Sequence, residues 1–436
     1  MASGATRREF LDGIGRAAGV TALSGTFAAL AMERVEAAVQ RVAGLAPQKV
    51  AGDEDFWLPI QDAWDADRTL LNLNNGGCSP APRLALEALF RMWRFANQTM
   101  YHNLMRVLEP QRETVRADLA ALFGADPEEI ALVRNASEAL ETVTLGIPLE
   151  RGDEVLSTTH DYPRMVTTWK QRALRDGIVF KQIALPVPPK DLSEIFTLFA
   201  QAITPKTKVL HFCHVVNITG QILPVQALCR LAREKGIKTI VDGAHAFAHL
   251  DFQRDDLECD FYGTSLHKWL SAPVGNGMLY VKKELIPSIW PLMGNDPPQS
   301  GDIRKFEQFG TYPVPVSLAI GESIRLHRSI GAARKQARLR FLRDRWEKPL
   351  LANPKFRSLT SPDPAQSCGV ATIALEGVDA GKLCEHLLQK HRIVVSPMGH
   401  PDVKGIRVTP HVYTTLPEVD RFVAAMEQIA RDGLPN

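Results

Sequence analysis

Residues 239–283 read TIVDGAHAFAHLDFQRDDLECDFYGTSLHKWLSAPVGNGMLYVKK. Asp242 directly follows a short apolar run, and Lys268 comes 26 residues later in Ser-Leu-His-Lys, ahead of a Gly-rich turn into a second apolar run. Short apolar runs are typical of strands buried on both faces of a mainly parallel sheet. Ligands of such sheets bind at the carboxyl ends of the strands. Asp242 therefore stands at a predicted ligand site.

The polar residues of this stretch suit one cofactor, pyridoxal 5′-phosphate (PLP). Its aldehyde reacts with an amine, its pyridine nitrogen pairs with an acid, and its phosphate accepts hydrogen bonds. Lys268 offers the amine, Asp242 the acid, and Ser265 and His267 the donors. Alone, Asp242 is compatible with a turn cap and His267-Lys268 with a chance dipeptide. Together they favour Lys268 as the Schiff-base amine and Asp242 as the acid that keeps the ring an electron sink.

Composition excludes several classes of partner. The 436 residues are 45% hydrophobic, enough for a large core, and 51 basic residues nearly balance 49 acidic ones. The chain has no large excess of positive or negative charge that would favour binding to nucleic acid or to a membrane surface. The substrate is therefore expected to be a small molecule. The six cysteines lie far apart, without C-x-x-C or metal-type Cys/His spacing. We expect ordinary buried thiols and no metal site.

The N-terminal segment, residues 1–45, resembles a twin-arginine export signal. Arg7-Arg8 precedes an Ala- and Gly-rich run that ends near residues 29–31, although Asp12 and Arg16 depart from the usual pattern. The resemblance implies a periplasmic or secreted protein. The alternative is a frayed amphipathic helix on a cytoplasmic protein. No other apolar run reaches the roughly 20 residues that span a bilayer.

The rest of the chain indicates an α/β fold with two domains. Strand and helix patterns alternate between residues 110 and 290, as in βα units around a parallel sheet. We expect strands at 130–133, 153–157, 208–215 and 237–241, with helices at 113–123 and 225–232. A large domain is predicted over 70–305, and a smaller α+β domain over 46–69 and 306–436. The basic helix 330–346 is expected to have a solvated surface.

These residues, taken with motifs elsewhere, resemble the class V aminotransferase family of fold-type I PLP enzymes, and within it the isopenicillin N epimerase-like branch. The resemblance runs from Leu71 to Phe422. It rests on Leu-Asn-Asn-Gly-Gly-Cys-Ser-Pro at 73–80, Arg-Asn-Ala-Ser-Glu at 134–138 and Arg-Val-Thr at 407–409. It implies a large domain built on a mainly parallel seven-stranded sheet and a homodimer.

The resemblance also assigns cofactor contacts. Ala136 and Ser137 match the turn that holds the phosphate, and Asn217 matches the residue near the phenolic oxygen. His245 falls in the same neighbourhood. Alignment by eye puts Tyr162 on the pyridine face, with His160 as the competing residue.

Three further residues imply contacts beyond the cofactor. Arg407 matches the arginine that holds a substrate α-carboxylate with two parallel hydrogen bonds, and Asn75 belongs to the segment at the site entrance, so both are predicted to bind substrate. Gly310 and Thr311 match a segment that reaches the neighbouring subunit's phosphate, with one extra residue before the glycine.

The reaction is less determined than the cofactor. A cysteine desulfurase needs a cysteine on a loop ahead of the carboxylate-binding arginine, and residues 396–401 contain none. Tyr162 opposite Lys268 suits an epimerase, but an aminotransferase or a C–S/β-elimination lyase stays open, as does a PLP-binding pseudoenzyme. His102, His249, His400 and His411 are expected to be structural.

Overall fold

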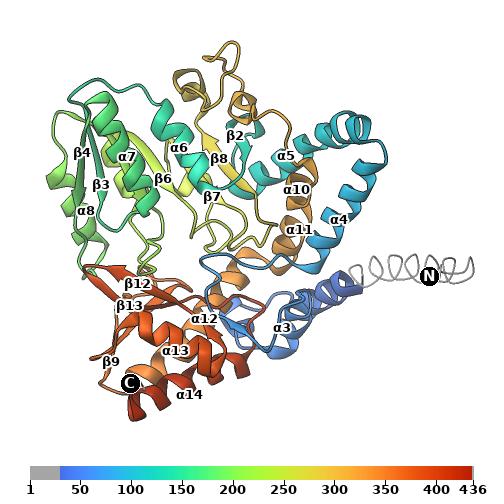
Figure 1. The fold of residues 1–436 in the computed structure, drawn as a ribbon, viewed down its shortest axis with the longest axis vertical. Helices are drawn as coiled ribbons and strands as arrows, with labels where there is room; N and C mark the ends of the chain where they lie inside the picture. The colour runs from blue at the N-terminus through green and yellow to red at the C-terminus, as the bar shows by residue number, and fades with distance from the viewer. Residues whose placement is uncertain (1–29, 435–436) are drawn as a thin grey trace, which may run out of the picture.

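The computed structural model describes residues 30–434, and its centre is a seven-stranded sheet (Figure 1). The strand order is β2-β8-β7-β6-β5-β3-β4. All neighbours pair in parallel except β8, which is antiparallel to both β2 and β7. The strands are β2 (Ile130–Val133), β3 (Glu154–Thr158), β4 (Val179–Ile183), β5 (Thr207–Cys213), β6 (Lys238–Asp242), β7 (Phe261–Ser265) and β8 (Gly277–Val281). The predicted α/β class with a mainly parallel sheet is confirmed.

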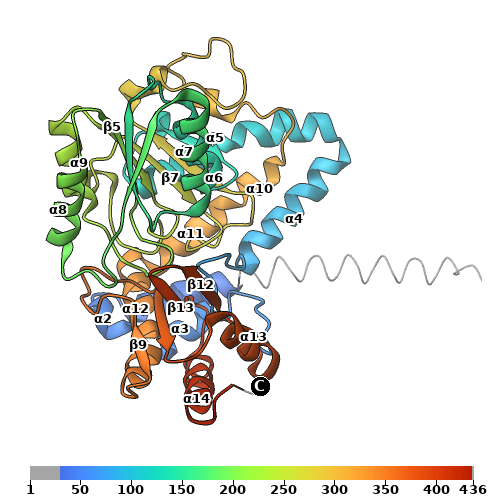
Figure 2. The ribbon, with the colours of Figure 1, turned by 60° about the vertical axis from the view of Figure 1, so that its left-hand side comes forward.

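Helices cover both faces of this sheet (Figure 2). The sheet therefore separates two apolar clusters, one on each face. On one face, Leu140 of α6 and Trp169 of α7 are fully buried in one apolar cluster. On the other face, Leu119 of α5, Phe199 of α8 and Leu228 of α9 belong to a second cluster. The helices are α5 (Arg112–Phe123), α6 (Ala136–Gly146), α7 (Pro163–Asp176), α8 (Leu192–Ala202) and α9 (Val225–Glu234). Apolar side chains on both faces explain the short, uninterrupted apolar runs of the inner strands.

The smaller domain is an antiparallel sheet backed by helices. Its strand order is β12-β13-β10-β9. The strands are β9 (Phe356–Ser358), β10 (Ala371–Leu375), β12 (Ser396–His400) and β13 (Val403–Val408), and the helices are α12 (Ala332–Leu351), α13 (Ala380–His391) and α14 (Leu416–Asp432). The pair β1 (Leu71–Asn72) and β11 (Ile393–Val394) is parallel and ties the start of the large domain to the small one.

The packing places the domain boundary later than residue 306. Helices α10 (Val314–Leu318) and α11 (Ile320–Ile330) pack on α4 (Arg83–Gln98) and α5 of the large domain, whereas α12 packs on α14 and β9. The change of domain therefore falls at Gly331, between α11 and α12. The short helix α2 (Pro47–Val50) does contact α12, and α3 (Glu54–Gln61) follows it.

The remaining helical segments are single turns or short irregular helices. They are η1 (His102–Leu108), η2 (Glu109–Gln111), η3 (Pro127–Glu129), η4 (Arg254–Asp256), η5 (Lys283–Ser288) and η6 (Ile303–Glu307).

The basic helix α12 is not the solvated surface that its composition predicts. Lys335, Arg338 and Arg343 are buried. Lys335 donates its ammonium to the carbonyl of Trp269, and Arg338 donates to the carbonyl of Ala51 at 2.9 Å and to Glu54. These charges join α12 to segments far away in the sequence, which helical periodicity alone does not reveal. The prediction was wrong for these three side chains.

Only part of the predicted export signal, residues 1–45, falls within the described residues. The twin-arginine motif lies outside them. Residues 30–41 are helical, and Met32, Val35, Ala38 and Val42 are buried in the core. A removed segment that extended to residue 45 would take these side chains with it. Among residues 30–434, no helix has the length and apolar character needed to cross a membrane.

Candidate active site

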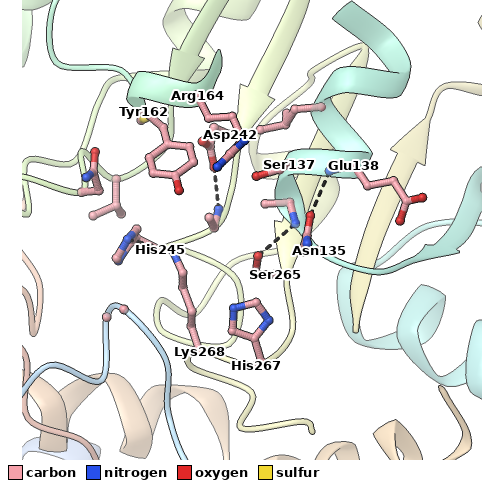
Figure 3. A pocket seen from close by; sticks show the side chains of 18 of the residues that line it. Asn135, Ser137, Glu138, Tyr162, Arg164, Asp242, His245, Ser265, His267 and Lys268 are labelled. Carbon is pink, nitrogen blue, oxygen red and sulfur yellow. Dashed lines mark hydrogen bonds between the residues drawn. The ribbon is translucent and has the colours of Figure 1, made fainter. Parts of the chain in front are cut away.

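One cavity of about 600 Å³ collects most of the residues predicted from the sequence. It opens where β5, β6 and β7 end, and one side of it comes from the small domain. Its lining includes Ala136, Ser137, Tyr162, Asn217, Asp242, His245, Ser265, His267, Lys268 and Arg407. Figure 3 shows Tyr162, Asp242, His245 and Lys268 around one space, with Ser137 and Ser265 beside it.

The N-terminus of α6 forms an anion-binding turn in this cavity. Asn135 is the N-cap, and its side chain accepts a hydrogen bond from the Glu138 amide at 2.9 Å. The Ala136 amide donates to Ser265 Oγ at 2.9 Å, which joins the turn to the end of β7. A Cβ on Gly277 would lie 2.6 Å from Asn135 Cα, so β8 approaches the turn only because it has glycine there. The amides and the positive dipole end of a helix N-terminus attract phosphate.

Asp242 is the last residue of β6, and it is buried. One of its carboxylate oxygens accepts a hydrogen bond from the Ala244 amide at 2.9 Å. Burial raises its pKa to about 6, although that bond and Lys268 oppose the rise. Gly243 follows because a Cβ there would overlap the Tyr262 ring. The chain therefore turns tightly and leaves the carboxylate at the cavity.

Lys268 lies between β7 and β8 with its amine against His245. Lys268 Nζ and His245 Nε2 are 3.1 Å apart. Burial lowers the pKa of Lys268 to about 8 and that of His245 well below its usual value. The imidazole is therefore neutral, and its Nε2 can accept from the amine. A lowered pKa gives Lys268 the neutral form that a nucleophilic amine requires.

Arg407 brings the small domain into the site. It lies on β13, and its two terminal nitrogens donate to the Asn217 carbonyl and to Asn74 Oδ1, both at 2.9 Å. The side chain is 6% exposed, and burial lowers its pKa to about 10. Among the described residues, no acidic side chain pairs with it. A buried cation without a counterion is costly, so the site is ready for an anion.

Two predicted residues lie outside the cavity lining. Asn75, predicted to bind substrate, is fully buried and holds Thr409 and Tyr413, with Tyr413 Oη donating to it at 2.6 Å. The Asn75 side chain therefore stabilises the segment that carries it, whereas the preceding residue, Asn74, contacts Arg407. Neither asparagine lines the cavity, so a substrate contact by Asn75 stays a prediction. Thr311 is exposed and does not line this cavity.

The competition between Tyr162 and His160 has a structural answer. Tyr162 caps α7, lines the cavity and is 40% exposed. His160 is buried beside His400 of the small domain and is not part of the cavity lining. Four of the six cysteines are buried as expected, whereas Cys78 is exposed and Cys384 is half-buried.

Sequence reasoning missed some of the lining. Arg164 follows Tyr162 in the first turn of α7, and Cys213 ends β5 directly opposite Asp242. Cys213 lies within the strand predicted at 208–215, but the prediction did not show that the strand ends there, beside Asp242. Arg164 gave no signal, because an arginine in a first helical turn is ordinary.

The profile of the family described as aminotransferase class-V matches residues 72–422. The chain belongs to the class-V aminotransferase family. An isopenicillin N epimerase from Streptomyces clavuligerus is 36% identical over 83% of this chain and 96% of its own length. A probable cysteine desulfurase from a Synechocystis species is 29% identical over 62% of this chain and 67% of its own. A solved C-DES mutant, with glycine covalently linked to its PLP cofactor, superposes with a TM-score of 0.75 at 22% identity, covering 84% of this chain and 98% of its own.

The family therefore confirms the predicted fold type and the cofactor, PLP. The residues present fit this cofactor. Asn217 Oδ1, His245 Nδ1 and His267 Nδ1 are buried without a partner among the described residues, and all three side chains belong to the cavity lining. Buried polar atoms are normally satisfied. Unpartnered atoms around an anion-binding turn, an acid and a lysine suit a polar, phosphorylated ring compound.

Proposed function

We propose that the protein is an isopenicillin N epimerase-like enzyme that acts at the α-carbon of an amino acid or an amino-acid-derived substrate. The observation that carries this proposal is Arg407, buried without an acidic partner among the described residues, in the same cavity as Lys268 and Asp242. A planar guanidinium binds carboxylates through paired hydrogen bonds. Asn217 and Asn74 hold that guanidinium in place before any ligand arrives.

Different residues of the chain would carry out different parts of this reaction. When bound, PLP supplies the electron sink that makes an α-proton removable. The α6 turn with Ser137, Ser265 and His267 would hold its phosphate, and Asp242 would keep its ring nitrogen protonated. Lys268 Nζ would remove the α-proton, because its lowered pKa favours the neutral base.

Tyr162 is compatible with epimerisation. It comes from the N-cap of α7, whereas Lys268 comes from the β7–β8 connection, so the two side chains enter the cavity from different elements (Figure 3). Its hydroxyl would return a proton to the second face of the α-carbon. Desulfuration is less well supported, because residues 396–400 form β12 and carry no cysteine.

The reaction can be assigned by product analysis. Purified enzyme is incubated with a panel of L- and D-amino acids in the presence or absence of an α-keto acid, and the products are separated on a chiral column. Formation of the enantiomer or epimer without keto acid supports the proposal. Loss of amino acid only with the keto acid would make the protein an aminotransferase, and release of ammonia and pyruvate or sulfide would make it a lyase.

We also propose two features of its cellular form. The exposed Gly310 and Thr311 fit a homodimer in which this segment reaches the partner's phosphate site. Arg7-Arg8 and the following apolar run fit export by the twin-arginine route, which carries folded, cofactor-loaded proteins. A cleavage site near residues 29–31 would keep the buried Met32 and Val35 in the mature chain.

A further inference from the structure

His160 is a buried histidine with an unused ring nitrogen. It follows β3, at the start of the connection to α7, and is 2% exposed. Its Nε2 is buried and has no hydrogen-bond partner among the described residues. Leaving such an atom unpaired costs free energy, so each case calls for a reason. The PLP site does not provide one, because His160 does not line that cavity.

The small domain places two more ligand-type side chains at this point. His400 ends β12, and its ring meets that of His160 edge to face, with centroids 4.7 Å apart. His400 Nε2 lies 3.1 Å from the Thr159 carbonyl oxygen. A carbonyl only accepts, so Nε2 carries the proton and Nδ1 keeps its lone pair. Asp402 follows in the turn between β12 and β13.

The three donor atoms converge without bonding to one another. Asp402 Oδ2 is 4.0 Å from His160 Nε2 and 3.8 Å from His400 Nδ1. All three atoms lie within 4.8 Å of one another. Ligand atoms about 2.0–2.2 Å from a tetrahedral zinc ion stand roughly 3.3 Å apart. A turn of the Asp402 side chain, which is 53% exposed, would shorten its distances to both histidines.

We propose that His160, His400 and Asp402 form a binding site for a divalent transition-metal ion of the zinc class. Two imidazole nitrogens and one carboxylate oxygen suit such an ion, and water would supply a fourth ligand. The bond from His400 to the Thr159 carbonyl is the outer contact that orients a metal-binding imidazole. Binding would replace the contact of 3.2 Å that the Asp402 amide now makes with His400 Nδ1.

A metal ion at this site would link the two domains beside the PLP cavity. His160 belongs to the large domain, whereas His400 and Asp402 belong to the β12–β13 hairpin of the small domain. Tyr162 lies two residues after His160 and lines the cavity. Metal binding would therefore fix the hairpin against the cavity wall that carries Tyr162. Sequence spacing could not reveal the site, because its ligands come from segments about 240 residues apart.

The test is zinc binding by the full-length, tag-free, PLP-loaded protein after treatment with a chelator. Zinc chloride is titrated against a competing indicator dye, and retained metal is counted by elemental analysis. We expect one zinc ion per chain that is lost in the His400→Ala/Asp402→Asn double variant. Each single variant should weaken binding at least about 10-fold, since each removes a direct ligand. Zinc should also raise the Tm of the wild type and not that of the double variant.

The controls separate this site from adventitious binding. His386→Ala on α13 removes a histidine whose ring lies 5.6 Å from that of His391, and within residues 30–434 no carboxylate completes a metal site with this pair. It should bind zinc as the wild type does. The partly exposed residues His400 and Asp402 are used because substituting the buried His160 risks misfolding. Equal zinc binding by the wild type and the double variant, or none by either, would overturn the proposal.

Discussion

In the role we propose for it, Lys268 must be neutral to capture the aldehyde of PLP, although lysine is normally charged at neutral pH. Burial lowers its pKa to about 8, and His245 offers a neutral acceptor 3.1 Å away. About one-tenth of the amine is then neutral at pH 7, against well below one-hundredth for an ordinary lysine of pKa about 10.4. The side chain is therefore prepared for its reaction before the cofactor arrives.

This preparation predicts a pH dependence of cofactor capture. Since only the neutral amine reacts, the rate at which cofactor-free protein regains its yellow colour should rise about 10-fold per pH unit up to pH 8 and then level off. Stopped-flow absorbance at limiting PLP measures it, with Lys268→Ala as the colourless control. An inflection near pH 10 would show that burial does not activate this lysine.

At the level of elements, the cap of α6 links stability to cofactor binding. Asn135 accepts from the Glu138 amide at 2.9 Å and holds the first turn of the helix against the cavity. Asp379 caps α13 in the same way, accepting from the Lys382 amide at 2.9 Å, but α13 lies in the small domain and does not line the cavity. The two caps form a matched pair.

Asn135→Ala and Asp379→Ala should each lower the free energy of unfolding by about 1 kcal/mol, the usual cost of losing a cap. Only Asn135→Ala should also weaken PLP binding, by about 10-fold, because it loosens the turn that would hold the phosphate. Urea denaturation and a PLP titration measure the two effects. Equal PLP affinities in the two variants would show that the α6 turn does not contribute to PLP binding.

The sequence predicted the elements that end at the site better than those that pack around it. The run before Asp242 became β6 and 130–133 became β2, because apolar patterning is local. The domain position of α11 and the burial of Lys335 depend on partners far along the chain. Asn75 lies outside the cavity lining because its side chain bonds Thr409 and Tyr413, partners far along the chain that the sequence does not indicate.

At the scale of the whole molecule, the site is built from both domains, and we propose that a second subunit completes it. Thr311 is exposed in a single chain and lies outside that chain's cavity. If it serves the partner's phosphate site, two inactive variants can complement each other. Lys268→Ala mixed with Thr311→Asp should regain up to about one-quarter of wild-type activity, since half the dimers are mixed and each holds one intact site.

The control is each variant mixed with itself after the same dissociation and reassociation. It should remain inactive. Absence of recovery in dimers shown to be mixed would mean that Thr311 acts within its own subunit or not at the phosphate.

The central claim is that Lys268 removes an α-proton from an amino acid held by Arg407. Proton NMR in heavy water, without keto acid, follows the α-proton signal of each member of an amino acid panel. The claim predicts that wild-type protein exchanges the α-proton of at least one amino acid for deuterium and forms its opposite configuration, whereas Lys268→Ala slows exchange at least about 1,000-fold. No exchange with any amino acid, or equal exchange by Lys268→Ala, would contradict it.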